Sequence, residues 1–174
     1  DGDENYQPMR VPLEGGFPEP VFGDRFEGER VFLVEYSHQA GKVYLVVEHN
    51  REPLIVTYRG DLESGELVEL ARSRWGFIPY AAGPDHDQVA LVEEYASGDT
   101  ALFRWRADQT ELELLYGEPR DRRETPQPAR LTGFDSAAFT PDGRRLLVVT
   151  ALFSDSRGPA VFDLESPGEP RPLE

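Results

Sequence analysis

The residues of this sequence that could act as catalytic nucleophiles are serines, and none of them lies in a nucleophile elbow. A hydrolase serine of that type lies in a Gly-x-Ser-x-Gly turn, and an acid and a histidine follow later in the chain. The 174 residues contain no such motif. Ser136 and Ser154 have acidic neighbours, but His38, His49 and His86 all lie far from them in sequence. We therefore expect no catalytic residue in this chain.

Two segments contain the residue types of a metal site without its spacing. Asp85-His86-Asp87 precedes an apolar run directly, where a polar turn is expected. Residues 1–5 begin like a calcium loop, which needs Gly at its sixth position and Glu at its twelfth. Tyr6 and Pro12 occupy those positions, and the chain has no Cys and no glycine-rich phosphate loop. We expect no metal and no cofactor.

The net charge of the chain limits the classes of partner that the chain is expected to bind. Its net charge is −15, with 18 basic and 33 acidic residues. Nucleic acids and anionic lipid surfaces both attract basic surfaces, so we expect neither as a partner. The longest apolar run, 146–153, is far shorter than the roughly 18–20 residues that span a bilayer. These features fit a cytoplasmic protein without a membrane segment.

The elements that would position any site are predicted to be β-strands. Apolar runs of four to eight residues alternate with clusters of Gly, Pro, Asp and Ser, which is typical of strands joined by turns. The segment that comes closest to a helical stripe, 62–72, is interrupted by Gly65. The chain is therefore predicted to be all-β, with its clearest strands at 31–36, 43–49, 54–58, 89–95, 101–105, 146–152 and 160–164.

These strands recur in units of four. The second strand of each unit begins at Val43, Val89 and Leu146, at intervals of 46 and 57 residues. The longer interval comes mostly from one inserted loop, whose charged run Arg120–Glu124 is expected either to be solvated or to contact another domain. The single segment 1–174 is thus divided into the outer half of one unit (1–22), three full units (31–70, 77–116 and 134–174) and the inserted loop (117–130).

Four antiparallel strands every 40–50 residues are typical of a β-propeller blade. Three and a half blades are too few for a closed ring of about four to eight blades, so a partial propeller is predicted. Such a segment would pack against further blades, or would associate with itself through its open faces. A β-sandwich is the alternative fold, although it does not predict the repeat.

Three stretches of the chain carry further motifs: 3–22, with Asp3-Glu4-Asn5-Tyr6-Gln7, then 43–70, and 139–174, with the turn Thr140-Pro141-Asp142-Gly143. These stretches resemble blades of the first domain of prolyl oligopeptidase family serine peptidases, especially the acylaminoacyl-peptidase-like branch. The resemblance implies a non-catalytic propeller that gates the access of short peptides to a separate α/β-hydrolase domain. TolB-like propellers share the Pro-Asp-Gly turn, so a stand-alone protein-binding scaffold is the alternative function.

The innermost strand of each blade faces the central channel of a propeller, so its side chains are candidates for contact with a peptide. These strands are predicted at 31–37, 77–82 and 134–139. The candidate channel-lining residues are Glu35, Tyr36, Tyr80 and Ser136. Glu35 adds to a negative field that favours the cationic N-terminus of a peptide.

Overall fold

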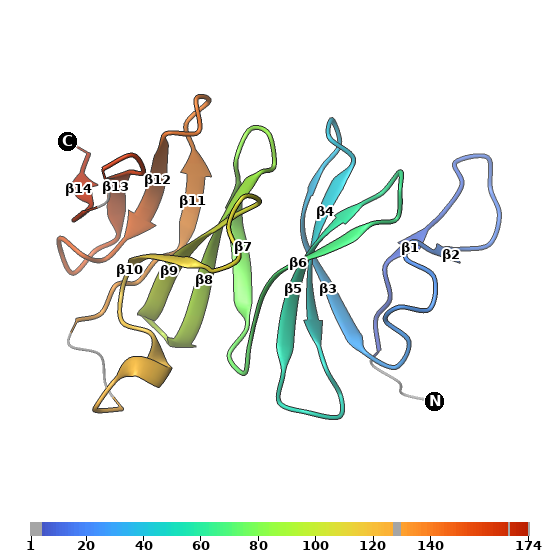
Figure 1. The fold of residues 1–174 in the computed structure, drawn as a ribbon, viewed down its shortest axis with the longest axis horizontal. Coiled ribbons are helices and arrows are strands. Elements are labelled where there is room, and N and C mark those ends of the chain that lie inside the picture. The colour runs from blue at the N-terminus through green and yellow to red at the C-terminus, as the bar shows by residue number, and fades with distance from the viewer. Residues whose placement is uncertain (1–4, 127–129, 167, 174) are drawn as a thin grey trace. The chain divides into compact units, whose positions relative to one another are not determined.

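The structure is a computed structural model that describes residues 5–126, 130–166 and 168–173 (Figure 1). Fourteen strands and one 3-10 turn, η1 (Arg120–Arg122), are the regular elements of these residues. The described residues include no helix with the length and apolarity that crossing a bilayer requires. The chain forms two compact units, one that ends at Phe77 and one that begins at Ile78.

The first unit contains a short hairpin and a four-stranded meander. The hairpin pairs β1 (Met9–Arg10) with β2 (Glu19–Pro20). The meander is antiparallel and has the order β3-β4-β5-β6. Its strands are β3 (Arg30–Ser37), β4 (Lys42–Glu48), β5 (Ile55–Asp61) and β6 (Leu67–Ser73).

The core of the first unit lies between the meander and the segment that follows the hairpin. Phe22 and Phe26 make an edge-to-face contact with ring centroids 6.0 Å apart, and both belong to one buried cluster with Val43 and Leu45 of β4. Tyr44, whose side chain points to the other face of β4, is also fully buried. A strand that is buried on both faces needs apolar residues at successive positions, which explains the continuous apolar run of β4.

The second unit contains two four-stranded antiparallel meanders in sequence order. In one of them, β7 (Phe77–Ala82) is followed by β8 (Gln88–Ala96), β9 (Asp99–Arg106) and β10 (Glu113–Tyr116). The other contains β11 (Ser136–Phe139), β12 (Arg145–Thr150), β13 (Gly158–Asp163) and β14 (Arg171–Pro172). Strand β7 takes its first residue, Phe77, from the end of the first unit.

The turn between β11 and β12 shows how local sequence sets the register of these meanders. Gly143 has a φ of 68°, which a residue without a Cβ adopts at low cost. The Thr140 hydroxyl donates to Asp142 at 2.5 Å and accepts the backbone N–H of Arg145 at 3.1 Å. The turn therefore closes within six residues, and Phe139 pairs with Leu146.

The two meanders of the second unit share one hydrophobic core. Ala90, Val92 and Leu102 of β8 and β9 pack in one cluster with Leu146 and Val148 of β12. All five side chains are at most 3% exposed. Burial of a Val or Leu side chain contributes about 1.5–3 kcal/mol, so the packing of the two sheets stabilises this unit.

The fold class predicted from the sequence is confirmed: the chain is all-β and forms a partial β-propeller of four-stranded antiparallel sheets. The third innermost strand begins at Ser136, two residues later than predicted, because Phe134 is buried in the core ahead of the strand. The division of 1–174 into blades and an inserted loop stays a prediction.

Candidate functional site

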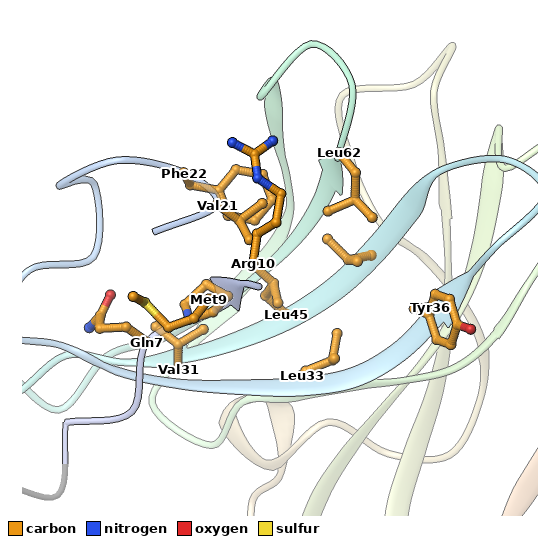
Figure 2. A pocket seen from close by; sticks show the side chains of 12 residues that line it. Gln7, Met9, Arg10, Val21, Phe22, Val31, Leu33, Tyr36, Leu45 and Leu62 are labelled. Carbon is orange, nitrogen blue, oxygen red and sulfur yellow. The ribbon is translucent and has the colours of Figure 1, made fainter. Parts of the chain in front are cut away.

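The first unit contains an apolar groove between the β1–β2 hairpin and the β3–β4 pair (Figure 2). Its volume is about 550 Å³. We call it the hairpin groove. Its walls come from the segments around β1 and β2 and from β3, β4 and the end of β5, and its lining residues include Met9, Val21, Phe22, Val31, Leu33, Tyr36, Val43, Leu45 and Leu62.

The hairpin wall of the groove is fixed by hydrogen bonds to the loop before β3. The Gln7 side-chain amide donates to the carbonyl of Phe26 at 2.6 Å and to that of Glu29 at 3.0 Å. The backbone N–H of Val31 donates to the carbonyl of Tyr6 at 3.1 Å. These bonds hold the hairpin against the start of β3, so the groove is a preformed feature of this unit.

The chemistry of the hairpin groove is that of a surface for apolar side chains. Figure 2 shows Met9, Val31 and Leu45 converging on it, with Gln7 and Arg10 as its polar lining residues. The Arg10 guanidinium pairs with Glu19 at 3.3 Å, so its charge is already partnered. Such a groove binds by burying apolar area, and polar groups at its rim orient the bound molecule.

Two of the predicted channel residues lie side by side on β3, which is an edge strand of its sheet. Tyr36 is 60% exposed and lines the hairpin groove. Glu35 pairs with Tyr44 across the strands, so its carboxyl lies on the opposite face. Glu35 is an exposed residue, yet partial desolvation of its carboxyl raises its pKa.

The other two predicted channel residues belong to the second unit. Tyr80 on β7 is half-buried, and its hydroxyl donates to the carbonyl of Phe134 at 3.4 Å. Burial raises the pKa of Tyr80, and the charges of Glu94 and Asp135 raise it further. Ser136 is exposed at the start of β11, two residues after Phe134. That all four residues line one channel stays a prediction.

A buried arginine site at the inserted loop was missed by the sequence analysis. The Arg123 side chain is only 1% exposed and donates to both carboxylate oxygens of Asp99, at 2.7 and 2.6 Å. It also donates to the carbonyl of Glu118 at 2.8 Å and lies 4.8 Å from the ring centre of Tyr95. Arg123 thus anchors the loop to the β8–β9 hairpin. The solvation expected for this charged run therefore does not apply to Arg123, although neighbours such as Arg122 are exposed.

The structure gives surroundings for Ser154, His49 and His86, three of the residues that were weighed as catalytic candidates. The Ser154 hydroxyl donates to the carbonyl of Ser156 at 2.6 Å within one turn. His49 lies 3.4 Å from the carboxylate of Glu29. His86 has a φ of 57° in the turn before β8. In the described parts of the chain, no three His, Asp or Glu side chains are grouped as metal ligands, and the calcium-like start of the sequence, 1–4, lies outside them.

Known protein structures share this fold at low sequence identity. TolB from Acinetobacter baumannii matches 95% of this chain at 14% identity, with a TM-score of 0.59. A structure from a study of two prolyl endopeptidases matches 95% at 15% identity, with a TM-score of 0.57. The β-propeller domain of the Trilobed protease from Pyrococcus furiosus matches 82% at 13% identity, with a TM-score of 0.55.

These likenesses define the class of the protein as a partial β-propeller, and at such identities they show the fold alone. The chain spans only 36%, 25% and 43% of the lengths of the TolB, endopeptidase and Trilobed protease chains. No protein-family model and no curated protein sequence matches it.

Proposed function

We propose that this chain is a non-catalytic propeller segment of a prolyl oligopeptidase-like serine peptidase, in which it gates the access of short peptides to a separate α/β-hydrolase domain. The sequence of residues 3–22 favours the acylaminoacyl-peptidase-like branch of that family. A cytoplasmic location and further blades of the same propeller as partners belong to this proposal.

The observation that carries the proposal is the exposure of polar and aromatic side chains on the first strand of a meander. Strand β3 is an edge strand, and Glu35 and Tyr36 are exposed on it. A peptide that passes along such an edge meets a carboxylate and a phenol before it meets the apolar core. The net charge of −15 adds a field that attracts the N-terminal ammonium of a peptide.

The experiment uses the full-length protein that contains this segment. Glu35→Gln and Tyr80→Phe should each raise the KM for short peptides with a free N-terminus, and Glu35→Gln should also weaken the dependence of KM on ionic strength. Glu63→Gln is the matched control, because it removes the same charge from an exposed turn after β5. Unchanged KM and salt dependence in both variants, at unchanged stability, would show that the peptide route lies elsewhere.

A stand-alone binding scaffold of the TolB-like kind is the second candidate. The preformed apolar groove favours it, and the fold shared with TolB over 95% of the chain is compatible with it. A fluorophosphonate probe distinguishes the two functions, because it labels an activated serine of a hydrolase domain. Labelling of the full-length protein supports the peptidase. A full-length protein that ends with its last blade and takes no label supports the scaffold.

A further inference from the structure

Another hollow lies within the second unit and is lined by residues from both of its meanders. It lies at the end of the unit where β9 and β13 finish, and its volume is about 850 Å³. We call it the arginine cleft, because Arg104, Arg106 and Arg144 all line it. Sites for small molecules have volumes of about 300–1,000 Å³, so the cleft is large enough to hold one.

Strand β9 directs two of these arginines into the cleft. Side chains two residues apart on a strand share a face, and Leu102 of β9 lies in the core that the two meanders share. Arg104 and Arg106 follow Leu102 on that face. Gln88 pairs with Arg106 across the strands, and its side-chain amide donates to the carbonyl of Gly143 in the other meander at 3.0 Å. The face therefore runs from the apolar core through Arg104 to Arg106 at the mouth of the cleft.

The buried guanidinium of Arg104 has half of its hydrogen-bonding edge unused. The side chain is only 9% exposed, and its Nε and Nη2 both donate to one oxygen of Glu113, at 2.8 and 2.5 Å. The Nη1 nitrogen bonds none of the described residues, and it is not among their buried unpartnered atoms, so water reaches it. A guanidinium carries five N–H donors in a fixed fork geometry. The end formed by Nη1 and Nη2 can therefore bind a second carboxylate while Glu113 keeps the other edge.

The two arginines at the mouth of the cleft are held more loosely. The Arg106 guanidinium pairs with Asp108 through one nitrogen, at 2.8 Å. Arg144 lies 3.5 Å from the carboxylate of Glu165, and both of these side chains are largely exposed. An exposed ion pair of this kind contributes little free energy, so Arg144 can turn towards a bound molecule at small cost.

We propose that the arginine cleft binds a small dicarboxylate. One carboxylate occupies the open end of the Arg104 guanidinium, and the other lies between Arg106 and Arg144. Arg104 and Arg106 are two residues apart on one strand, which separates their backbones by roughly 7 Å, and a short carbon chain can join two carboxylates across that span. The proposal is independent of the peptide route proposed above.

The carboxylates of the cleft set the strength of this binding. Glu113, Asp108 and Glu165 pair with the arginines in the free protein, and they repel an incoming anion. We therefore expect a dissociation constant on the order of 0.1–1 mM. The carboxylate on Arg104 contributes most, because a charge-assisted hydrogen bond gains strength where water is largely excluded.

The test is isothermal titration calorimetry on the full-length protein that contains this segment, with succinate and glutarate as probes. Succinamate, in which one carboxylate of succinate is replaced by an amide, should bind about tenfold more weakly, because one charge-assisted contact is lost. Succinamide has no carboxylate and should not bind. This series separates recognition of two carboxylates from general affinity for a small polar molecule.

Two variants and one matched control locate the site. Arg104→Lys keeps a cation beside Glu113 but lacks the second fork, so succinate should bind about tenfold more weakly. Arg144→Gln removes an exposed charge at the mouth and should weaken binding about three- to tenfold. Arg72→Lys is the control, because Arg72 bonds Glu69 through the same two nitrogens, Nε and Nη2, but lies in the first unit. It should leave the affinity for succinate unchanged.

The outcomes separate the proposal from its alternatives. The absence of saturable binding of succinate and glutarate at up to about 10 mM would overturn it. Equal affinity for succinate in the parent and in Arg144→Gln would also overturn it, and this variant decides the question if Arg104→Lys does not fold. Binding of a peptide through its C-terminal carboxylate, without binding of either dicarboxylate, would overturn it in favour of a peptide ligand. Binding of succinate that both variants weaken and Arg72→Lys does not supports the proposal.

Discussion

Removal of the Arg123 side chain is the most informative perturbation of this protein outside the groove. In Arg123→Ala the carboxylate of Asp99, which is 8% exposed with its partner in place, loses both guanidinium bonds at 2.7 and 2.6 Å. The carbonyl of Glu118 and the ring of Tyr95 lose their cationic partner as well. The inserted loop thereby loses this charged anchor to the β8–β9 hairpin.

The expected loss of stability follows from the burial of this pair. Removal of one partner from a buried ion pair costs about 3–5 kcal/mol, because the other charge stays in a site that water does not reach. The loop can relieve part of this cost by opening so that water reaches Asp99. We therefore expect a decrease of about 3 kcal/mol in the free energy of unfolding, together with faster hydrogen exchange at 118–126.

Urea unfolding of four chains measures this effect: the parent, Arg123→Ala, Asp99→Ala and the double variant. The double-mutant cycle should give a coupling energy of about 1–3 kcal/mol between the two side chains. Arg122→Ala is the matched control, because Arg122 is exposed in the same 3-10 turn, and its effect should stay within about 0.5 kcal/mol.

One result would refute the argument. If Arg123→Ala and Arg122→Ala change the free energy of unfolding equally, and the coupling energy to Asp99 is below about 0.5 kcal/mol, then the loop is not anchored by this pair.

Three further predictions concern the two cores and one charged turn. Gly60→Ala should lower the midpoint of urea unfolding by an amount equivalent to about 1–3 kcal/mol, since the new Cβ would lie 2.5 Å from the Phe22 ring. Thr132→Val should cost about 1–3 kcal/mol in the same assay, because the buried Thr132 hydroxyl bonds both the N–H of Thr100, at 3.2 Å, and its carbonyl, at 2.5 Å. At Asp61 the Lys42 ammonium, then the backbone N–H of Ser64, hold the pKa well below its usual range. The free energy that Asp61 contributes is therefore fully present above about pH 4 and is lost at lower pH, so the stability difference between the parent and Asp61→Asn should shrink there in acid titrations. A difference that stays constant down to the acid transition would contradict this assignment.

The repeat and the turns could be predicted from the sequence because their causes are local. Alternation of apolar and polar residues sets which segments are strands, and Gly143 with Thr140 and Asp142 sets the turn that pairs β11 with β12. Since each meander is made of strands that follow one another along the chain, a regular spacing is enough to identify the fold class. The proposed channel residues follow from the same spacing and remain predictions.

The anchored loop and the open groove were decided by tertiary structure alone. Arg123 lies in a run of mixed charge whose residues look alike in the sequence, and its partner Asp99 lies 24 residues earlier. Only the folding of the loop onto the β8–β9 hairpin selects one of these arginines for burial. The exposure of a strand aromatic residue is likewise set by its neighbours in space: Tyr36 is 60% exposed at the hairpin groove, whereas Phe139 packs against the core of the second unit.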